Sequence, residues 1–503
     1  MKHFFYKTSI LITVIVLSNS CYKDKGNYDY SRLPDIKINV NDEYYASQFE
    51  TINIPTIIDF GNDHESDYEF QWRIWLNSLG NTPKKVISST KDLSYTVTEI
   101  PGSYLLVLTC MNKKTGVKTY KEIKLSVSGV ISEGWMVLHE KDGKTDFDLI
   151  MTPFISKRFE KDMVLTNLYE SVNGERLSGR GVKISSYFAL GRYQYVIVLT
   201  ENDGVRLAAT TMQKTYDFKT LMLDNKPLKP ENYFFFSYYW CLGRGYEVLI
   251  SDGRYYINET LGKGFTEPIL KDGETYKTSK WGAKWLWTFK GMIYDELHGR
   301  FLGIQGTPLI TATKLPEAIG RQFDWNNMNG TLLYMDTGFK HYDYALIKDW
   351  TTNEINLFVL NFDEKNNFDV AKYSAQLCPE LDGAKFHAIG ERGNVFYYCT
   401  DKDIYLYDYA GTKKGNKIMS TKNGEYITGM KILKPCIDRY IASHPYDNKV
   451  LILSTYNDAS QEGKVYMYYV NESNGQIDIS SEKVFTGFGK IFDMNYNYPK
   501  YGI

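Results

Sequence analysis

The sequence predicts an all-β protein in which a small β-sandwich precedes a β-propeller. Two observations carry this prediction: short apolar runs separated by polar turns fill the chain, and similar runs return at a nearly regular spacing. The composition agrees, because Tyr, Phe and Trp favour strands and make up 15% of the 503 residues. Almost no stretch after Gly134 shows a long helical period, so sheets are expected to form most of the core.

The first residues have the order of a secretory signal that ends in a lipidated cysteine. Basic residues precede an uncharged run over residues 8–17, and small residues then lead to Cys21. This run is too short for a membrane-spanning helix, which needs roughly 20 apolar residues. We therefore predict a signal peptide over residues 1–20 and lipidation at Cys21, which would hold the protein on a membrane surface. An ordinary secretory signal with a chance cysteine is the alternative.

Alternating runs over residues 31–130 predict the β-sandwich. Residues 68–75 alternate strictly, residues 103–110 follow a Pro-Gly turn, and residues 120–127 close the segment. We expect Trp72 to lie in the central strand, with its indole packed between the sheets.

The remainder, residues 131–503, repeats itself and predicts the propeller. Its apolar runs start roughly 45 to 60 residues apart, the spacing of four-stranded blades with loops, and most precede a polar hairpin turn. The seven runs are residues 135–138, 195–199, 247–250, 301–304, 344–347, 395–398 and 450–453. Seven blades are expected, and eight remain open because residues 233–240 and 331–335 can be assigned differently. Two unrelated β domains are the alternative interpretation.

The residues that begin at Cys21 resemble a known family. The run Cys-Tyr-Lys-Asp-Lys-Gly-Asn-Tyr-Asp-Tyr over residues 21–30 is similar to the start of PKD-like lipoproteins of Bacteroidetes. The hairpin after Pro101 resembles the closing hairpin of PKD and other immunoglobulin-like domains. The resemblance implies a lipidated tether over residues 21–30, an immunoglobulin- or PKD-like sandwich and a place beside Sus-type outer-membrane importers. Lys23-Asp24 resembles, in part, the signal that sends such lipoproteins to the cell exterior.

Charge and motifs exclude several classes of function. The formal net charge is -1 and no basic run occurs, so there is no electrostatic case for nucleic-acid binding. The motifs of zinc proteases, serine hydrolases and nucleotide-binding loops are absent, and the histidines and cysteines lack metal-ligand spacing. We therefore expect no catalytic residue, no metal site and no cofactor, and we interpret the chain as a non-enzyme.

The candidate ligand-binding residues are aromatic. They belong to two segments rich in tryptophan, and flat aromatic faces offer rigid contact area to sugars and peptides alike. The candidates are Tyr238, Tyr239, Trp240 and Trp281. The alternative is that this aromatic face lies between blades, which we favour for Trp285 and Trp287.

The expected function is that of a cell-surface lipoprotein of the outer membrane, without chemistry of its own. It would bind a glycan or peptide nutrient, or dock on a Sus-type TonB-dependent importer and its lipoprotein partner. A propeller glycosidase or lyase is the first alternative; it requires two carboxylates about 5 to 10 Å apart and would show a carboxylate-lined centre. An aromatic or filled centre would favour binding. The second alternative is a purely structural transporter subunit, which an apolar patch without a cleft would indicate.

Overall fold

The computed structural model describes most of the chain after residue 35. The described residues are 36–77, 84–99, 101–128, 133–189, 193–223, 226–237, 245–259, 264–270, 273–283, 289–306, 310–362, 367–435 and 444–497. The predicted signal peptide, the lipidation site Cys21 and the tether lie outside these residues. Within the described ranges, no helix is both long enough and apolar enough to cross a membrane.

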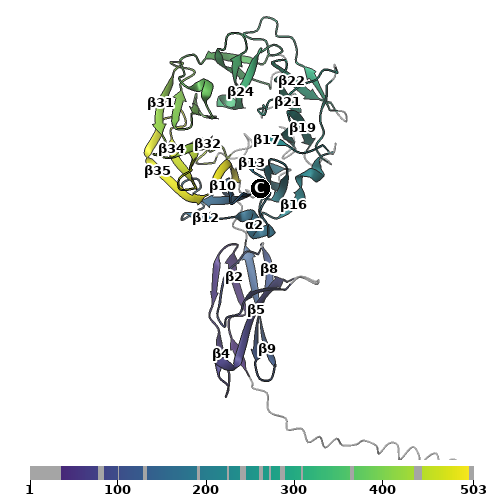
Figure 1. Cartoon of the computed structure of the whole chain (residues 1–503), viewed down its shortest axis with the longest axis vertical. Helices are drawn as coiled ribbons and strands as arrows, with labels where there is room; N and C mark the ends of the chain where they lie inside the picture. Colours follow the sequence, from purple (N-terminus) through teal and green to yellow (C-terminus); the bar gives the residue numbers. More distant parts are fainter. Residues whose placement is uncertain are drawn as a thin grey trace, which may run out of the picture. The chain divides into compact units, whose positions relative to one another are not determined.

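The N-terminal strands form the predicted sandwich architecture. A five-stranded sheet has the order β2-β9-β8-β5-β6, and two smaller sheets pair β1 with β4 and β3 with β7 (Figure 1). The strands are β1 Lys37–Asn39, β2 Glu43–Ser47, β3 Thr51–Ile54, β4 Ile57–Asp59, β5 Tyr68–Leu76, β6 Lys85–Ser88, β7 Leu93–Thr96, β8 Gly102–Asn112 and β9 Lys118–Ser128, with a 3-10 turn η1 at Glu65–Asp67. The predicted runs over residues 68–75, 103–110 and 120–127 correspond to β5, β8 and β9.

Trp72 is the buried centre of this sandwich. Tyr68, Trp72 and Ile74 are buried while Arg73 between them is exposed, as the alternating sequence requires. The Trp72 indole N–H donates to the carbonyl oxygen of Thr90 at 3.1 Å, which satisfies its one polar atom inside the core. β5 lies between β8 and β6, so Trp72 is on an interior strand, while β8 takes the middle of the five-stranded sheet.

Seven sheets follow one another around a ring in the described part of residues 134–497 (Figure 1). Their orders, from periphery to centre, are β12-β11-β10-β36, β16-β15-β14-β13, β19-β18-β17, β20-β23-β22-β21, β27-β26-β25-β24, β31-β30-β29-β28 and β35-β34-β33-β32. The strands of the first four sheets are β10 Gly134–Lys141, β11 Lys144–Met151, β12 Met163–Leu165, β36 Lys490–Asn497, β13 Gly181–Ala189, β14 Tyr193–Thr200, β15 Gly204–Ala208, β16 Lys214–Asp217, β17 Pro230–Ser237, β18 Gly245–Ser251, β19 Arg254–Glu259, β20 Ile269–Leu270, β21 Gly291–Asp295, β22 Arg300–Gln305 and β23 Thr311–Lys314.

The other three sheets comprise β24 Gly330–Thr337, β25 Asp343–Asp349, β26 Ile355–Leu360, β27 Asp369–Ser374, β28 Phe386–Ile389, β29 Phe396–Cys399, β30 Asp403–Tyr407, β31 Gly415–Ser420, β32 Tyr426–Ile432, β33 Val450–Asn457, β34 Glu462–Val470 and β35 Ile477–Phe488. The short helical pieces are α2 Leu168–Asn173, η2 Phe218–Leu221, η3 Phe339–His341 and η4 Leu381–Gly383. This is the predicted seven-bladed propeller. Of the segments that left an eighth blade open, residues 233–237 belong to β17 and residues 331–335 to β24, the innermost strands of two of the seven sheets, while residues 238–240 lie outside the described residues.

The last strand closes the ring by completing the first sheet. β36 pairs antiparallel with β10, with Trp135 opposite Tyr496 and Val137 opposite Met494. The chain enters β36 through Gly489, where an added Cβ would collide with the carbonyl oxygen of Glu140. Glycine is therefore required at this close approach between the two ends of the propeller.

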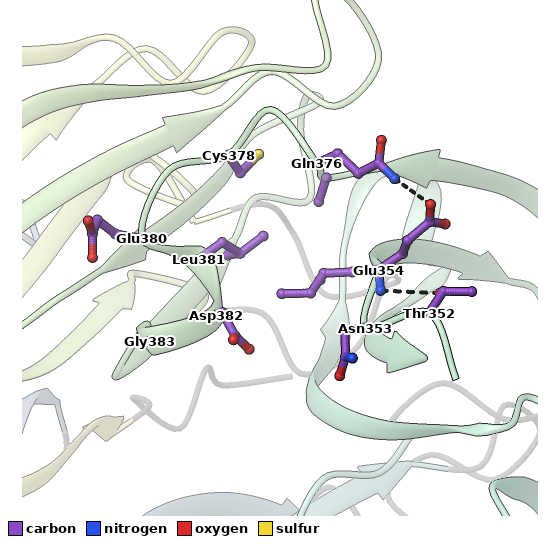
Figure 2. Close-up of a pocket in the computed structure, with 11 residues that line it drawn as sticks. Thr352, Asn353, Glu354, Gln376, Cys378, Glu380, Leu381, Asp382 and Gly383 are labelled. Carbon is purple, nitrogen blue, oxygen red and sulfur yellow. Dashed lines mark hydrogen bonds between the residues drawn. The ribbon is translucent and has the colours of Figure 1, made fainter. Parts of the chain in front are cut away.

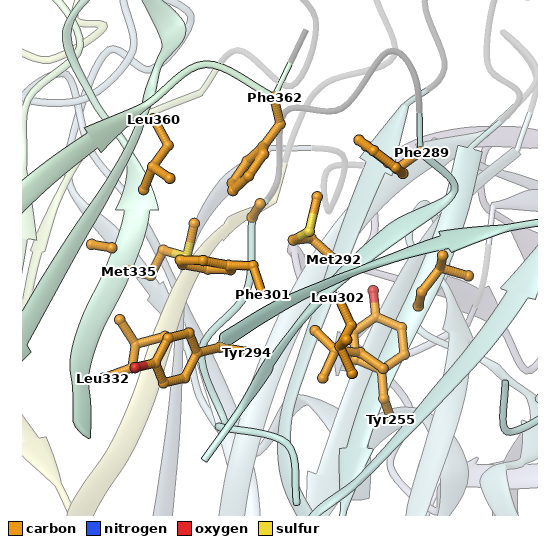
Figure 3. Packing of buried hydrophobic residues seen from close by; sticks show 14 of the residues in the cluster. Tyr255, Phe289, Met292, Tyr294, Phe301, Leu302, Leu332, Met335, Leu360 and Phe362 are labelled. Atoms are coloured by element: carbon orange, nitrogen blue, oxygen red, sulfur yellow. The ribbon is translucent and has the colours of Figure 1, made fainter. Parts of the chain in front are cut away.

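Adjacent sheets pack through apolar side chains. Figure 3 shows one such cluster, in which residues of β21 and β22 meet residues of β24 and β26. Tyr294 and Phe301 make an edge-to-face contact with ring centroids 4.9 Å apart, and Phe301 meets Phe362 at 5.4 Å. Such pairs contribute about 0.5–1.5 kcal/mol beyond the burial of their area. The blades form a rigid frame for the polar groups at their ends.

A buried ion pair also joins two neighbouring blades. Arg206 on β15 donates to both carboxylate oxygens of Glu247 on β18, at 2.7 and 2.6 Å. Tyr233 and Asn258 donate to the same carboxylate at 2.9 and 2.6 Å. Both charges are buried and hydrogen-bonded, which is the condition under which buried charges are tolerated.

Candidate functional site

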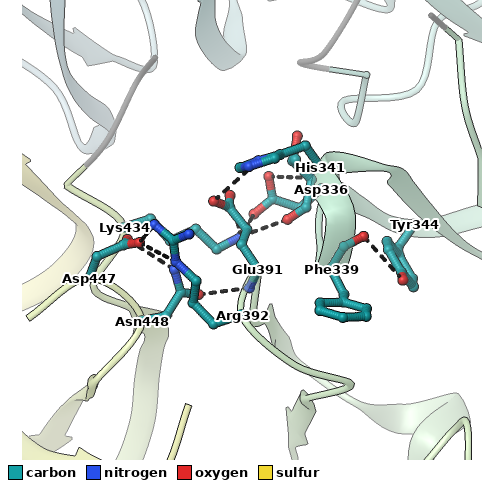
Figure 4. Close-up of polar contacts among 10 residues, drawn as sticks. Asp336, Phe339, His341, Tyr344, Glu391, Arg392, Lys434, Asp447 and Asn448 are labelled. Carbon is teal, nitrogen blue, oxygen red and sulfur yellow. Dashed lines mark hydrogen bonds and ion pairs between the residues drawn. The ribbon is translucent and has the colours of Figure 1, made fainter. Parts of the chain in front are cut away.

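Charged side chains gather where three innermost strands end. Asp336 is on β24, Glu391 follows β28, and Lys434 follows β32. The Lys434 ammonium lies 3.3 Å from Asp336 Oδ2 and 3.4 Å from Glu391 Oε1 (Figure 4). It also donates to the carbonyl oxygen of Thr337 at 2.7 Å. The exposed fraction of the side chain is 17% for Lys434, 19% for Asp336 and 13% for Glu391, so water reaches the cluster only in part.

A second ion pair extends the cluster. The Arg392 guanidinium donates to Asp447 Oδ2 through Nε and Nη2, at 2.8 and 2.5 Å. Asn448 accepts the backbone N–H of Glu391 at 2.7 Å, which fixes that loop. His341 Nδ1 lies 3.9 Å from the Glu391 carboxylate. All these residues belong to connections between the first and second strands of their blades, so they share one face of the propeller.

Glu391 is the residue of this cluster whose pKa is shifted toward neutrality. Burial raises the pKa of Glu391 to about 7, and the opposing effect of Lys434 is partly offset by the nearby Asp447 and Asp336 carboxylates. Burial lowers the pKa of Lys434, but Asp336 and Glu391 outweigh this and raise it overall, so Lys434 stays charged. A carboxylic acid with a pKa near neutrality can hold or donate a proton at physiological pH.

Another innermost strand carries a carboxylate that is held by two lysines. Asp493 on β36 lies 2.6 Å from the Lys431 ammonium on β32 and 3.4 Å from the Lys183 ammonium on β13. It also accepts the backbone N–H of Ile184 at 3.1 Å. Burial raises the pKa of Asp493, but the two lysines lower it below its ordinary value. The centre of the propeller is therefore charged, and its charges are paired across different blades.

The structure also contains an open pocket of about 400 Å³ at the turn between β25 and β26 (Figure 2). Its floor is buried and apolar, and its rim is exposed and polar. The lining residues are Thr352, Asn353, Glu354, Ile355, Ala375, Gln376, Cys378, Glu380, Leu381, Asp382 and Gly383. The turn joins a second strand to a third, so the pocket lies on the opposite face from the Glu391 cluster, because consecutive strands are antiparallel.

Local sequence explains why this turn is rigid. Asp349 Oδ1 accepts the backbone N–H groups of Thr351 and Thr352, both at 2.8 Å, and these bonds lower the pKa of Asp349. Asn353 takes a left-handed conformation with φ of 59°, which asparagine tolerates better than most residues. On the rim, Gln376 donates to Glu354 Oε1 at 2.5 Å.

The aromatic candidates have different outcomes. Tyr238, Tyr239 and Trp240 lie outside the described residues, as do Trp285 and Trp287. Trp281 is partly buried, and its ring meets Tyr334 of β24 edge-to-face at 5.0 Å. It packs against the cores of two neighbouring blades, and its part in ligand binding stays a prediction.

Metal-ligating groups are scattered in the described structure. No three of its His, Cys, Asp and Glu side chains form a group that could hold a metal ion. The described cysteines, Cys110, Cys378 and Cys399, are buried free thiols. Burial raises the pKa of the Cys110 thiol to about 11, as for an inert core residue.

Comparison with known protein families gives a match for part of the chain. The model of the PKD-like family matches residues 21–181. This confirms the predicted resemblance for that part of the chain. The matched region begins at Cys21 and runs through the sandwich strands into the first propeller blade, ending at the first residue of β13. No curated protein matches the sequence.

Comparison with solved structures gives matches over most of this chain. A quinonprotein alcohol dehydrogenase-like protein from Bacteroides thetaiotaomicron has a TM-score of 0.50 and 14% identity, over 92% of this chain and 100% of that chain. Dihydro-heme d1 dehydrogenase NirN in complex with DHE has a TM-score of 0.39 and 10% identity, over 74% and 76% of the two chains. The WD40 domain of SCAP from fission yeast has a TM-score of 0.27 and 7% identity, over 71% and 73%. At such identities the first similarity concerns the fold alone.

Proposed function

We propose that the protein is a lipid-anchored outer-membrane protein of the cell exterior that binds a nutrient as an accessory subunit of a Sus-type TonB-dependent importer. The observation that carries this proposal is the position of Cys21. It ends the predicted signal peptide, and the match to the PKD-like family begins at the same residue. The match therefore starts where the mature, lipidated chain would start.

Binding without chemistry agrees with the polar groups of the propeller. Asp336 and Glu391 share one lysine, and Asp447 is paired with Arg392, so these carboxylates already have cationic partners. The open pocket lies on the opposite face and offers an accessible volume with both apolar and polar walls. Recognition sites for small ligands combine these two kinds of surface.

Co-purification from native membranes tests the proposal. The full chain is extracted from the outer membrane in mild detergent, and the proteins that accompany it are identified by mass spectrometry. We expect a TonB-dependent transporter and its lipoprotein partner. Recovery of the protein without any transporter subunit, under conditions that preserve other membrane complexes, would contradict the importer assignment.

A propeller glycosidase or lyase is the second candidate, because Glu391 has a pKa raised to about 7 beside the carboxylate of Asp336. A general acid requires such a pKa. The test is turnover of a panel of polysaccharides by the wild type, by Glu391→Gln and by the control Glu317→Gln, which changes an exposed carboxylate. Our main proposal predicts no turnover by any of them. Turnover that only Glu391→Gln abolishes would establish the enzyme instead.

A further inference from the structure

We propose that the pocket at the β25–β26 turn binds a peptide through a basic side chain, lysine or arginine. This inference rests on the proposed nutrient-binding function and specifies its ligand class. The pocket belongs to one continuous region of the propeller, between the β25–β26 turn and the segment from β27 to η4.

The floor of the pocket suits the aliphatic part of such a side chain. Ile355, Ala375, Cys378 and Leu381 are buried and form its apolar base. Lysine and arginine pack their methylene stems along apolar surface while the charged head remains in a polar environment. A volume of about 400 Å³ accommodates one such side chain together with parts of its neighbours.

The rim supplies the charge that a basic head group needs. Glu354 and Asp382 extend from opposite walls, and Glu380 lies at the outer edge (Figure 2). All three side chains are exposed. Lys348 Nζ lies 2.9 Å from both carboxylate oxygens of Asp382, so this carboxylate binds an ammonium group in the folded chain and a basic ligand would share it with Lys348.

The lining also argues against other ligand classes. Among the described lining residues there is no lysine, arginine or histidine, so the lining itself offers no positive charge to an acidic ligand. None of them is aromatic, so the pocket lacks the flat ring on which a sugar would stack. The closest candidate ring in the turn is Trp350, whose indole N–H is bonded to Thr331 Oγ1 at 2.9 Å outside the lining.

Hydrogen bonds within the protein hold the groups of the pocket in place without a ligand. The Asp349 bonds hold the turn that carries Glu354, and the Gln376 amide holds the Glu354 carboxylate. A site whose groups are already ordered loses less conformational entropy on binding. Short basic peptides should therefore suffice as probes.

The test is an NMR or calorimetric titration of the full mature chain with blocked tripeptides Ala-X-Ala, where X is lysine, arginine, norleucine or glutamate. We expect saturable binding for lysine and arginine, and affinity at least fivefold lower for norleucine, which keeps the stem and lacks the charge. Binding of the lysine peptide should weaken as salt is raised to about 0.5 M, because exposed charges are screened.

Matched variants locate the binding. Glu354→Gln with Asp382→Asn should lower affinity for the lysine peptide at least fivefold, since exposed pairs each contribute up to about that factor. Glu317→Gln, an exposed carboxylate outside the pocket, should leave it unchanged. Both changes are at the surface, so the thermal midpoint should stay the same and report an intact fold.

Several results would overturn this inference. They are equal affinity for lysine and norleucine, an unaffected Glu354→Gln/Asp382→Asn variant, no saturable binding of either basic peptide, or displacement of the lysine peptide by a neutral oligosaccharide. If transporter subunits still co-purify in that case, the importer assignment stands and the ligand class of this pocket is wrong. If they do not, the proposed function fails independently.

Discussion

Replacing Glu391 with glutamine should remove a pH dependence from the folding stability of the propeller. In the folded protein, burial raises the pKa of Glu391 from 4.5 to about 7, so the folded state binds this proton more tightly than the unfolded state. The resulting stabilisation is fully present below about pH 4.5 and is lost as the pH rises through about 7. A pKa rise of this size corresponds to about 3 kcal/mol between the two limits.

The assay is urea unfolding of wild type and Glu391→Gln at pH 4 and pH 8. Glutamine mimics the protonated acid, so the variant should gain about 3 kcal/mol relative to wild type on going to pH 8. Asp146, whose pKa burial raises to about 6, titrates in both proteins and cancels in the difference. Glu317→Gln serves as an exposed control and should show no such gain. An identical difference between Glu391→Gln and wild type at both pH values would refute the buried, proton-holding role of Glu391.

Two further predictions concern the stability of the propeller. Arg206→Met should destabilise the protein by about 3–5 kcal/mol in urea unfolding, because Glu247 would be a buried carboxylate without its cation. A double variant that also replaces Glu247 with glutamine removes the buried charge and keeps an oxygen that can accept from Tyr233 and Asn258, so it should recover much of the loss. An equally destabilised double variant would contradict this explanation. Gly489→Ala should lower the thermal midpoint by several degrees, since the added Cβ meets the Glu140 carbonyl at the ring closure, whereas Gly383→Ala has open space and should not. Equal midpoints for the two alanine variants would show that the closure tolerates the methyl group.

The propeller was predictable because the second strand of each blade is buried on both faces. β18 and β33 illustrate this, since nearly every residue of each is buried and each contains a short apolar run, residues 248–250 and 450–453. Innermost strands such as β13 and β32 each carry a lysine among apolar residues, a pattern that in isolation is typical of a solvent-facing strand. The pairing of β36 with β10 joins residues 350 or more positions apart, and no local pattern specifies it.

The charged cluster could not be predicted from the sequence, for a related reason. Asp336, Glu391 and Lys434 lie in three different blades, and each looks like an ordinary charged residue at the end of a strand. Only the packing of three successive blades brings the two carboxylates to one ammonium group. The aromatic hypothesis followed residue type alone. Trp281 packs against Tyr334 between blades, which residue type alone does not distinguish from ligand binding, so its part in binding stays a prediction.

The central claim is that a lipidated Cys21 anchors the protein at the membrane, and the state of the mature N-terminus tests it most directly. The full chain is isolated from its native membrane fraction, and its N-terminal peptide is analysed by mass spectrometry, beside the Cys21→Ala variant. We predict that the wild-type chain begins at Cys21 with acyl chains attached, and that the variant leaves the membrane fraction in folded form. A wild-type chain with an unmodified Cys21, or with residues 1–20 still attached, would contradict the account.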